Sequence, residues 1–381
     1  MTTNEDKRHG KTEKAAFGRF GRTEIALMGA PCSDIKKIAE QLIEKLKSFR
    51  IAYVDADHKT EEEDVPNSMK SGGLLLYTDK IKFQRIDFTT QLTTYELNIL
   101  FNDYDLVFVN GNHFEAEHQL LIVDERKPLE KKLNKIHKPL AILRPDENVR
   151  LPEYLETHFG KELEVLPMYT ARQIDQLAQL IHDLLILQVP PIIGVVLAGG
   201  RSERMGHDKG LIDYHGLPQR EYLYHLLDGF TEMTFMSCRP DQKGEFAGKF
   251  MVIPDSTSGL GPFGALLSAF REYPNHALMV VACDIPLIDR EAINALLYAR
   301  NPSKIATAFY NKETNFPDPL LTIWEPKAYL HLLQFLGLGY SCPRKVLINC
   351  NSEIINPANE HWLLNANDPE EYARVKEILK K

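Results

Sequence analysis

The chain has 381 residues, 44% of them hydrophobic and 26% charged, with a formal net charge of −8 at pH 7. The length favours two domains, and the composition is that of a globular protein. The negative charge argues against nucleic acid as a partner, because binding there depends on surplus Lys and Arg. No apolar run is long enough to span a membrane, and the five scattered cysteines form no C-x-x-C pair. We therefore expect a cytoplasmic protein without a disulfide framework.

The first half alternates predicted strands and helices. Residues 1–22 are polar and are expected to form a flexible leader, and residues 23–188 a first domain. Its helices include an amphipathic one after the first strand and a closing one over 171–187. Its predicted strands are 24–30, 51–57, 105–111 and 138–145. The paired prolines Pro190 and Pro191 mark a linker between this domain and the next.

The second half, residues 189–381, begins a new alternation of strands and helices with the apolar run PIIGVVLAGG. Further predicted strands are 234–239, 249–255, 276–284, 304–310 and 320–324. Near-continuous apolar strands are typical of parallel sheets covered on both faces. The pattern predicts two three-layer α/β domains, and ligands of such sheets bind outside the carboxyl ends of the strands.

The first half offers one place for a phosphate loop, the segment GAPCSDIK after its first strand. Gly29 fits the P-loop pattern, but Asp34 stands at the second glycine and Ile35 at the lysine. YVDADHK and LVFVNGN resemble strand ends of the P-loop GTP-binding protein of molybdopterin guanine dinucleotide synthesis. We interpret this half as a degenerate P-loop-like fold that serves as a scaffold or docks a partner.

The second half carries a loop whose residue types suit phosphate. Gly199 and Gly200 follow a buried strand, where the lack of a Cβ lets backbone N–H groups approach an anion. Arg201, Arg204 and Lys209 add three positive charges to an acidic chain. The loop fits neither the P-loop nor the dinucleotide fingerprint, so it indicates a different kind of phosphate site.

Two further segments support a nucleotide site. Asp284 is expected at the exposed end of an apolar strand, where a carboxylate facing a phosphate loop suits Mg²⁺. Asp255 ends another predicted strand, and a small-residue loop leads from it to a helix near Pro262. The glycines of that loop would allow a planar ligand to lie against the backbone.

Together these segments resemble the molybdenum cofactor guanylyltransferase family. Its motif LAGG-x-S-x-RMG-x-DK is met over residues 197–209, and its C-D-x-P segment by Cys283, Asp284 and Pro286. The resemblance covers residues 192 onward and implies a Rossmann-like nucleotidyltransferase fold of the nucleotide-diphospho-sugar transferase type. The nucleotide-binding residues it implies are Leu197, Ala198, Gly199, Gly200, Arg201, Ser202, Lys209, Ser237, Asp255, Gly261, Pro262 and Asp284.

The resemblance also implies a reaction. GMP would pass from GTP to the terminal phosphate of molybdopterin, with Mg²⁺ held by Asp284 and pyrophosphate released. Lys209 would stabilise charge on the α-phosphate, and Arg204 would hold the pyrophosphate. Proteins of molybdenum cofactor synthesis or acceptor enzymes are the expected partners. Candidate pterin contacts are Asp318, Pro319, Arg344, Lys345, Asn365 and Asn367, of which Arg344 and Lys345 could equally begin a helix.

Two other functions remain open from the sequence. A related transferase could use CTP with the same pterin or another nucleotide with a sugar phosphate, although CTP-using relatives resemble the pattern LAAG and this chain has Gly199. A non-catalytic scaffold for cofactor delivery is the second alternative, and the presence of Lys209 and Asp284 argues against it for the second half.

Overall fold

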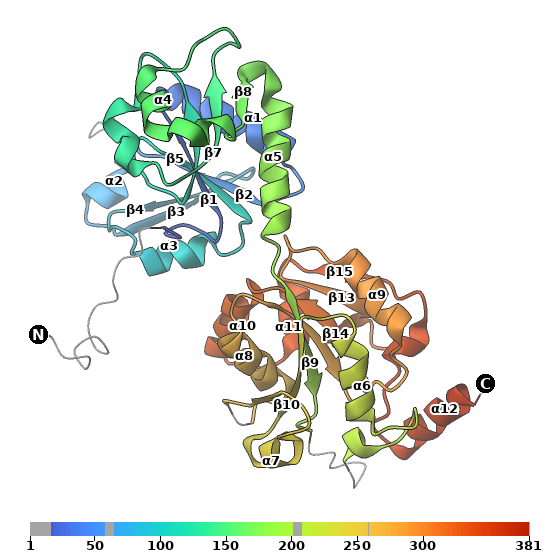
Figure 1. Ribbon diagram of the computed structural model, residues 1–381. Helices are drawn as coiled ribbons and strands as arrows, with labels where there is room; N and C mark the ends of the chain where they lie inside the picture. The colour runs from blue at the N-terminus through green and yellow to red at the C-terminus, as the bar shows by residue number, and fades with distance from the viewer. Residues whose placement is uncertain (1–16, 58–64, 201–207, 258, 381) are drawn as a thin grey trace, which may run out of the picture. The chain divides into compact units, whose positions relative to one another are not determined.

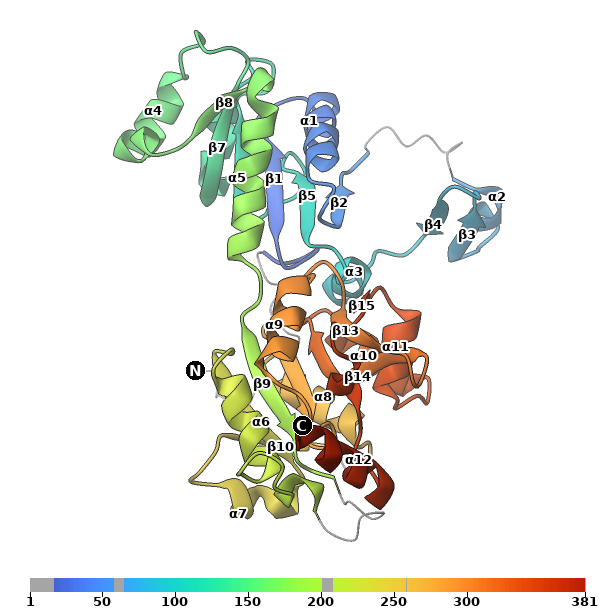
Figure 2. The same ribbon diagram turned by 90° about the vertical axis from the view of Figure 1, so that its right-hand side faces the viewer.

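The structure, a computed structural model, describes residues 17–57, 65–200, 208–257 and 259–380. The chain divides into two compact units, Met1–Leu187 and Gln188–Lys381, each built around its own sheet (Figures 1 and 2). Within the described residues no helix is long and apolar enough to cross a membrane.

The first unit contains a six-stranded parallel sheet in the order β2-β5-β1-β6-β7-β8. β6 and β8 are strands that the apolar periodicity did not predict. A separate antiparallel hairpin, β3-β4, was not predicted either. The strands are β1 (Glu24–Met28), β2 (Ile51–Val54), β3 (Leu75–Asp79), β4 (Gln84–Phe88), β5 (Leu106–Asn110), β6 (His118–Ile122), β7 (Lys138–Arg144) and β8 (Met168–Thr170).

Helices cover both faces of this sheet. On one face, α1 and α5 bury Ile35, Leu42 and Ile181 against strand residues such as Leu27 and Phe108. Side chains of α4 pack on the opposite face, and partly buried side chains of α3 pack there too. The result is a three-layer α/β unit, as predicted. The helices are α1 (Cys32–Lys45), α2 (Asn67–Lys70), α3 (Thr94–Phe101), α4 (Glu153–Phe159) and α5 (Ile174–Leu187).

The connection between β1 and α1 is too short to wrap a phosphate. α1 already begins at Cys32, so Asp34 and Ile35 belong to its first turn rather than to a loop. Ile35 is fully buried in the core, at the place where a P-loop would present its lysine. Asp34 forms an ion pair with Arg126, 2.7 Å from its Nη2. The segment thus serves the packing of this unit.

The second unit contains a seven-stranded sheet in the order β11-β10-β9-β12-β14-β13-β15. The apolar runs are typical of parallel strands, but the sheet is mixed, because β14 runs antiparallel to both of its neighbours. The remaining strand pairs are parallel. The strands are β9 (Ile192–Leu197), β10 (Met233–Cys238), β11 (Val252–Pro254), β12 (Ala277–Ala282), β13 (Ala306–Asn311), β14 (Phe316–Trp324) and β15 (Glu353–Ile355).

Two apolar clusters, one on each face, sandwich the second sheet. α6 and α9 pack on one face through Leu223, Leu227 and Ile293. α8, α10 and α11 pack on the other through residues such as Phe263 and Leu332. Both central strands, β9 and β12, end at the same edge because they are parallel. The helices are α6 (Gln219–Asp228), α7 (Lys243–Phe246), α8 (Pro262–Glu272), α9 (Arg290–Ala299), α10 (Ala328–Gly337), α11 (Pro343–Asn349) and α12 (Pro369–Leu379).

Candidate nucleotide-binding site

A cleft of about 760 Å³, part of it open to solvent, lies in the second unit at the carboxyl ends of β9, β10 and β12. This is the edge at which open α/β sheets bind ligands. Arg201, Ser202 and Arg204 lie outside the described residues. The predicted nucleotide-binding residues that line the cleft are Leu197, Ala198, Gly199, Gly200, Lys209, Ser237, Asp255, Gly261, Pro262 and Asp284.

The end of β9 forms one wall of the cleft through its backbone. The Ala198 N–H donates to the carbonyl of Ser237 (2.8 Å), which continues the pairing of β9 with β10 past the strand end. A Cβ on Gly199 would lie 3.3 Å from the backbone nitrogen of Arg239, tighter than ordinary contact. A glycine at 199 therefore lets two chain segments approach closely. Gly200, by contrast, faces open space.

Lys209 is held from the far end of the chain. It opens a short 3-10 helix, Lys209–Leu211, and its Nζ donates to Asn367 Oδ1 at 2.6 Å. The Asn367 N–H in turn donates to a carboxylate oxygen of Glu371 at 2.6 Å, on the first turn of α12. The sequence suggests Asn367 as a pterin contact, and in the structure its side-chain oxygen accepts a hydrogen bond from Lys209.

Asp284 follows β12 at the floor of the cleft. The residue is partly exposed, but its Oδ1 is buried and has no hydrogen-bond partner among the described residues. Burial raises the pKa of Asp284, the Lys209 charge lowers it, and the carboxylate of Asp318 raises it. A buried carboxylate oxygen without a partner is costly unless a cation or donor satisfies it.

Ser237 lies in β10, and Asp255 directly follows the neighbouring strand β11. The Ser237 hydroxyl donates to Asp255 Oδ1 at 3.3 Å. Burial raises the pKa of Asp255 to about 6, against the smaller lowering by this hydroxyl and by Arg239. Next to them α8 begins at Pro262 after Gly261, which has φ +55° and supplies no side-chain cap. Gly261 and Pro262, at this helix start, line the cleft, and the start of a helix favours an anion.

The candidate pterin residues are only partly brought together. Asp318 is buried in β14, and its Oδ1 accepts from the N–H groups of Leu320 and Leu321. Burial raises the pKa of Asp318, and the charge of Arg344 lowers it. Lys345 is exposed, with its Nζ 4.3 Å from the Tyr340 ring centroid. Pro319 is buried in β14 and Asn365 is partly exposed, and neither lines the cleft.

Two residues near the cleft were not among the predicted site residues. Asp208 lines it, and its side chain accepts from the Gly210 N–H at 2.9 Å, which fixes the turn that carries Lys209. Arg220 lies behind, 3.5 Å from Asp208 Oδ2 and with its guanidinium over the Phe246 ring. Asp208 stands inside the recognised motif and could have been chosen on that ground. Arg220 lies on α6, and no motif marks it.

The comparisons with known proteins concern this second unit. Residues 194–353 match the model of the MobA-like NTP transferase domain. A molybdenum cofactor guanylyltransferase of Pseudomonas aeruginosa is 31% identical over 202 residues, which are 50% of this chain and 97% of that protein. A molybdenum cofactor biosynthesis bifunctional protein of Synechocystis is 33% identical over 186 residues, 49% of this chain. The chain matches about half, 54%, of that protein's length.

A solved structure is also similar. Molybdopterin-guanine dinucleotide biosynthesis protein A from Archaeoglobus fulgidus is 21% identical, with a TM-score of 0.43 over 49% of this chain and 98% of that one.

Fold, cleft and comparisons together define the second unit as a nucleotidyltransferase domain of the MobA-like class. Through this unit, the chain belongs to the molybdenum cofactor guanylyltransferase family.

Proposed function

We propose that the second unit transfers GMP from GTP to the terminal phosphate of molybdopterin and releases pyrophosphate. One observation carries this proposal: Lys209 and Asp284 line the same cleft. The Oδ1 of Asp284 has no hydrogen-bond partner among the described residues. Family membership supports these substrates, since the Pseudomonas relative is named as a guanylyltransferase of the molybdenum cofactor.

The chain's own groups would position and neutralise phosphate. Gly199 and Gly200 line the cleft after β9, and Gly261 and Pro262 line it at the start of α8, where backbone N–H groups would bind phosphate oxygens. Lys209, oriented by Asn367, would place its charge at the α-phosphate, where negative charge develops during transfer. The attacking phosphate is an anion near neutral pH, so the site requires no general base.

The residues at the cleft floor fit Mg²⁺. The unpartnered Oδ1 of Asp284 is a hard oxygen ligand, and Mg²⁺ is commonly bound by one or two carboxylates together with substrate phosphates. When bound, the ion would neutralise phosphate charge. Among the described residues, no group of three or more His, Cys, Asp or Glu side chains could hold a metal.

Asp255 and Gly199 would select the base. An ionised Asp255 beside Ser237 can accept hydrogen bonds from the N–H groups on the edge of guanine, which cytosine presents differently. Asp318, Asn365 and Asn367 remain our candidates for the pterin side, with Arg344 lending positive charge near Asp318.

A direct assay tests the proposal. The full chain is incubated with Mg²⁺, molybdopterin and either GTP or CTP, and pyrophosphate release and the dinucleotide product are measured. Release with GTP supports the proposal. Release with CTP alone, or only with a sugar phosphate as acceptor, would replace it by the related transferase. Absence of product with every pair would favour a non-catalytic scaffold for cofactor delivery.

Matched variants give the assay a control. Lys209→Ala removes the cleft lysine, and Lys249→Ala removes an exposed lysine that does not line the cleft. We expect loss of transfer in the first variant and unchanged transfer in the second. For the first unit we propose a scaffold or docking role without nucleotide hydrolysis, because its β1–α1 connection contains neither the lysine nor the length of a P-loop.

A further inference from the structure

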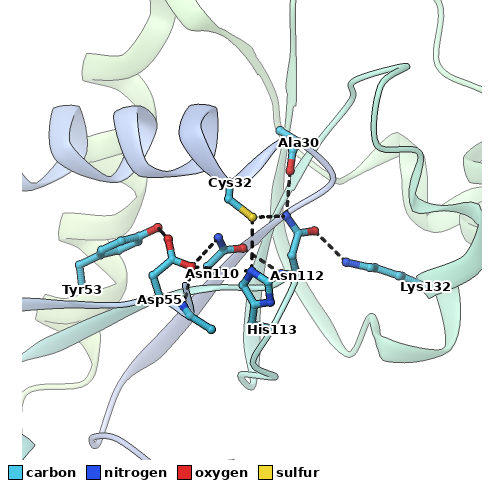
Figure 3. Close-up of polar contacts among 9 residues, drawn as sticks. Ala30, Cys32, Tyr53, Asp55, Asn110, Asn112, His113 and Lys132 are labelled. Carbon is cyan, nitrogen blue, oxygen red and sulfur yellow. Dashed lines mark hydrogen bonds and ion pairs between the residues drawn. The ribbon is translucent and has the colours of Figure 1, made fainter. Parts of the chain in front are cut away.

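The first unit holds a second cluster of reactive side chains, at the carboxyl edge of its own sheet. Cys32 is the first residue of α1, the helix that follows β1. His113 lies just after β5, the strand next to β1 in the sheet. The two side chains point toward each other, with Cys32 Sγ 3.3 Å from His113 Nε2 (Figure 3). A thiol within hydrogen-bond reach of an imidazole is the arrangement of an activated nucleophile.

A donor approaches the sulfur from a second direction. Asn112 Nδ2 donates to Cys32 Sγ at 3.6 Å and to the Ala30 carbonyl at 2.9 Å. Lys132 Nζ donates to Asn112 Oδ1 at 2.7 Å, which fixes the amide with its NH₂ group toward the sulfur. These contacts can support negative charge on the sulfur (Figure 3). The start of α1, a 14-residue helix without a side-chain cap, adds the positive end of its dipole.

The imidazole also has an acidic neighbour. Asp55 Oδ1 lies 3.9 Å from His113 Nε2 and accepts from Asn110 Nδ2 at 2.8 Å. The other carboxylate oxygen of Asp55 accepts from the Tyr53 hydroxyl at 2.8 Å. Asp55 therefore places a carboxylate beside the imidazole that would take the proton of the thiol.

The other four cysteines lie in different environments. Cys342 is exposed at the N-cap of the seven-residue helix α11, but among the described residues it has no histidine within hydrogen-bond reach. Cys238 and Cys283 are buried, and burial raises the pKa of both thiols, to about 11 for Cys238. Cys350 also approaches a histidine, 3.7 Å from His331 Nδ1. It follows the last residue of α11, however, where the helix dipole opposes a negative sulfur. Cys32 combines partial exposure, a base and a positive helix end.

We propose that Cys32 is a nucleophilic thiol that exchanges with low-molecular-weight disulfides, with His113 as its base. His113 takes the proton of Cys32, the sulfur attacks one sulfur of the small disulfide, and the S–S bond of that molecule breaks. A mixed disulfide forms on Cys32, and the other half leaves as a thiolate that is protonated by solvent. Cys32 is the sole cysteine of residues 1–187, so no cysteine of its own unit can displace the adduct.

The test follows exchange of the full-length protein with the chromophoric disulfide 5,5′-dithiobis(2-nitrobenzoate) at pH 7, with peptide mass spectrometry to locate each adduct. We expect the fastest phase to be lost in Cys32→Ser and kept in both Cys342→Ser and Cys350→Ser. His113→Gln should slow exchange at Cys32 at least about tenfold, as expected for loss of a general base. His331→Gln, the matched control, should leave that rate unchanged.

A second pH separates base catalysis from mere access. At about pH 10 an accessible thiol is largely ionised without help, so the wild type and His113→Gln should react at similar rates there. Equal slowing at both pH values, or a fast phase that survives in Cys32→Ser, would overturn the proposal. Should His113→Gln fail to fold, the wild type decides alone: Cys32 must react faster than both Cys342 and Cys350 at pH 7, by ratios that shrink at high pH. Incubation with oxidised glutathione should give one adduct, at Cys32, that dithiothreitol removes.

Discussion

The Nζ of Lys209 and the Oδ1 of Asn367 are joined by a 2.6 Å hydrogen bond between residues 158 positions apart in the chain. Through this bond the segment around residue 367 orients the lysine that lines the cleft. The same segment is tied to the cleft floor, because the Ala366 N–H donates to the carbonyl of Asp284 at 2.8 Å.

Replacement of Asn367 by Ala should therefore act on the lysine. A hydrogen bond to a charged group contributes about 1.5 kcal/mol or more, so we expect kcat to fall roughly tenfold or further. KM for GTP should change little. Steady-state kinetics with each substrate varied separately check this. A rise confined to KM for molybdopterin would instead show that Asn367 serves the pterin alone.

Replacement of Asp284 by Asn should separate stability from activity. The pKa of Asp284 is raised in the folded state, chiefly by burial, so ionisation of this group at neutral pH opposes folding. This penalty is present above the folded pKa and disappears as the pH falls through it. We expect the neutral amide to raise Tm at pH 7 while transfer falls by orders of magnitude, since an amide is a poor ligand for Mg²⁺. Calorimetry and the transfer assay measure both, and a lower Tm with retained activity would contradict the prediction.

Many strands and candidate site residues of the second unit could be predicted, because the candidate residues directly follow apolar strands. Runs such as ALMVVACD are apolar throughout, so the strand and the polar residue that ends it can both be read from the sequence. The antiparallel direction of β14 could not be, because an apolar run has no direction. The contact of Asn367 with Lys209 depends on how the last segment returns to the cleft, which spacing along the chain does not encode.

In the first unit the sequence predicted the loss of the phosphate loop, but it did not predict the contact between Cys32 and His113. Asp34 and Ile35 excluded a phosphate loop, and the structure shows Ile35 in the core. The approach of Cys32 to His113 joins residues 81 positions apart, and no motif links them. β8 has only three residues and β6 begins with the polar pair His118 and Gln119, so neither gives a long apolar signal.

Binding of GTP should depend on pH through Asp255. Burial raises the pKa of this carboxyl to about 6. The group is therefore largely ionised at about pH 7.5 and largely protonated at about pH 5. If the ionised form accepts hydrogen bonds from guanine, affinity should rise with pH through this range. Titration calorimetry at several pH values measures the effect. Asp255→Asn should bind more weakly at pH 7.5 and lose the dependence, and an unchanged profile in that variant would assign it to another group.

Adjacent glycines offer a controlled test of the strand end. A Cβ on residue 199 would lie 3.3 Å from the Arg239 nitrogen and 3.4 Å from the Cys238 Cα, whereas a Cβ on residue 200 would meet nothing within 4 Å. Because the crowded atoms of Arg239 and Cys238 are backbone, β10 must shift to admit a methyl group. We expect Gly199→Ala to lower Tm and Gly200→Ala to leave it nearly unchanged. The shift should also alter the wall beside the base, so the ratio of GTP to CTP use should fall in Gly199→Ala. Equal melting temperatures for the two variants, with an unchanged nucleotide ratio, would show that the close approach at residue 199 governs neither stability nor choice of base.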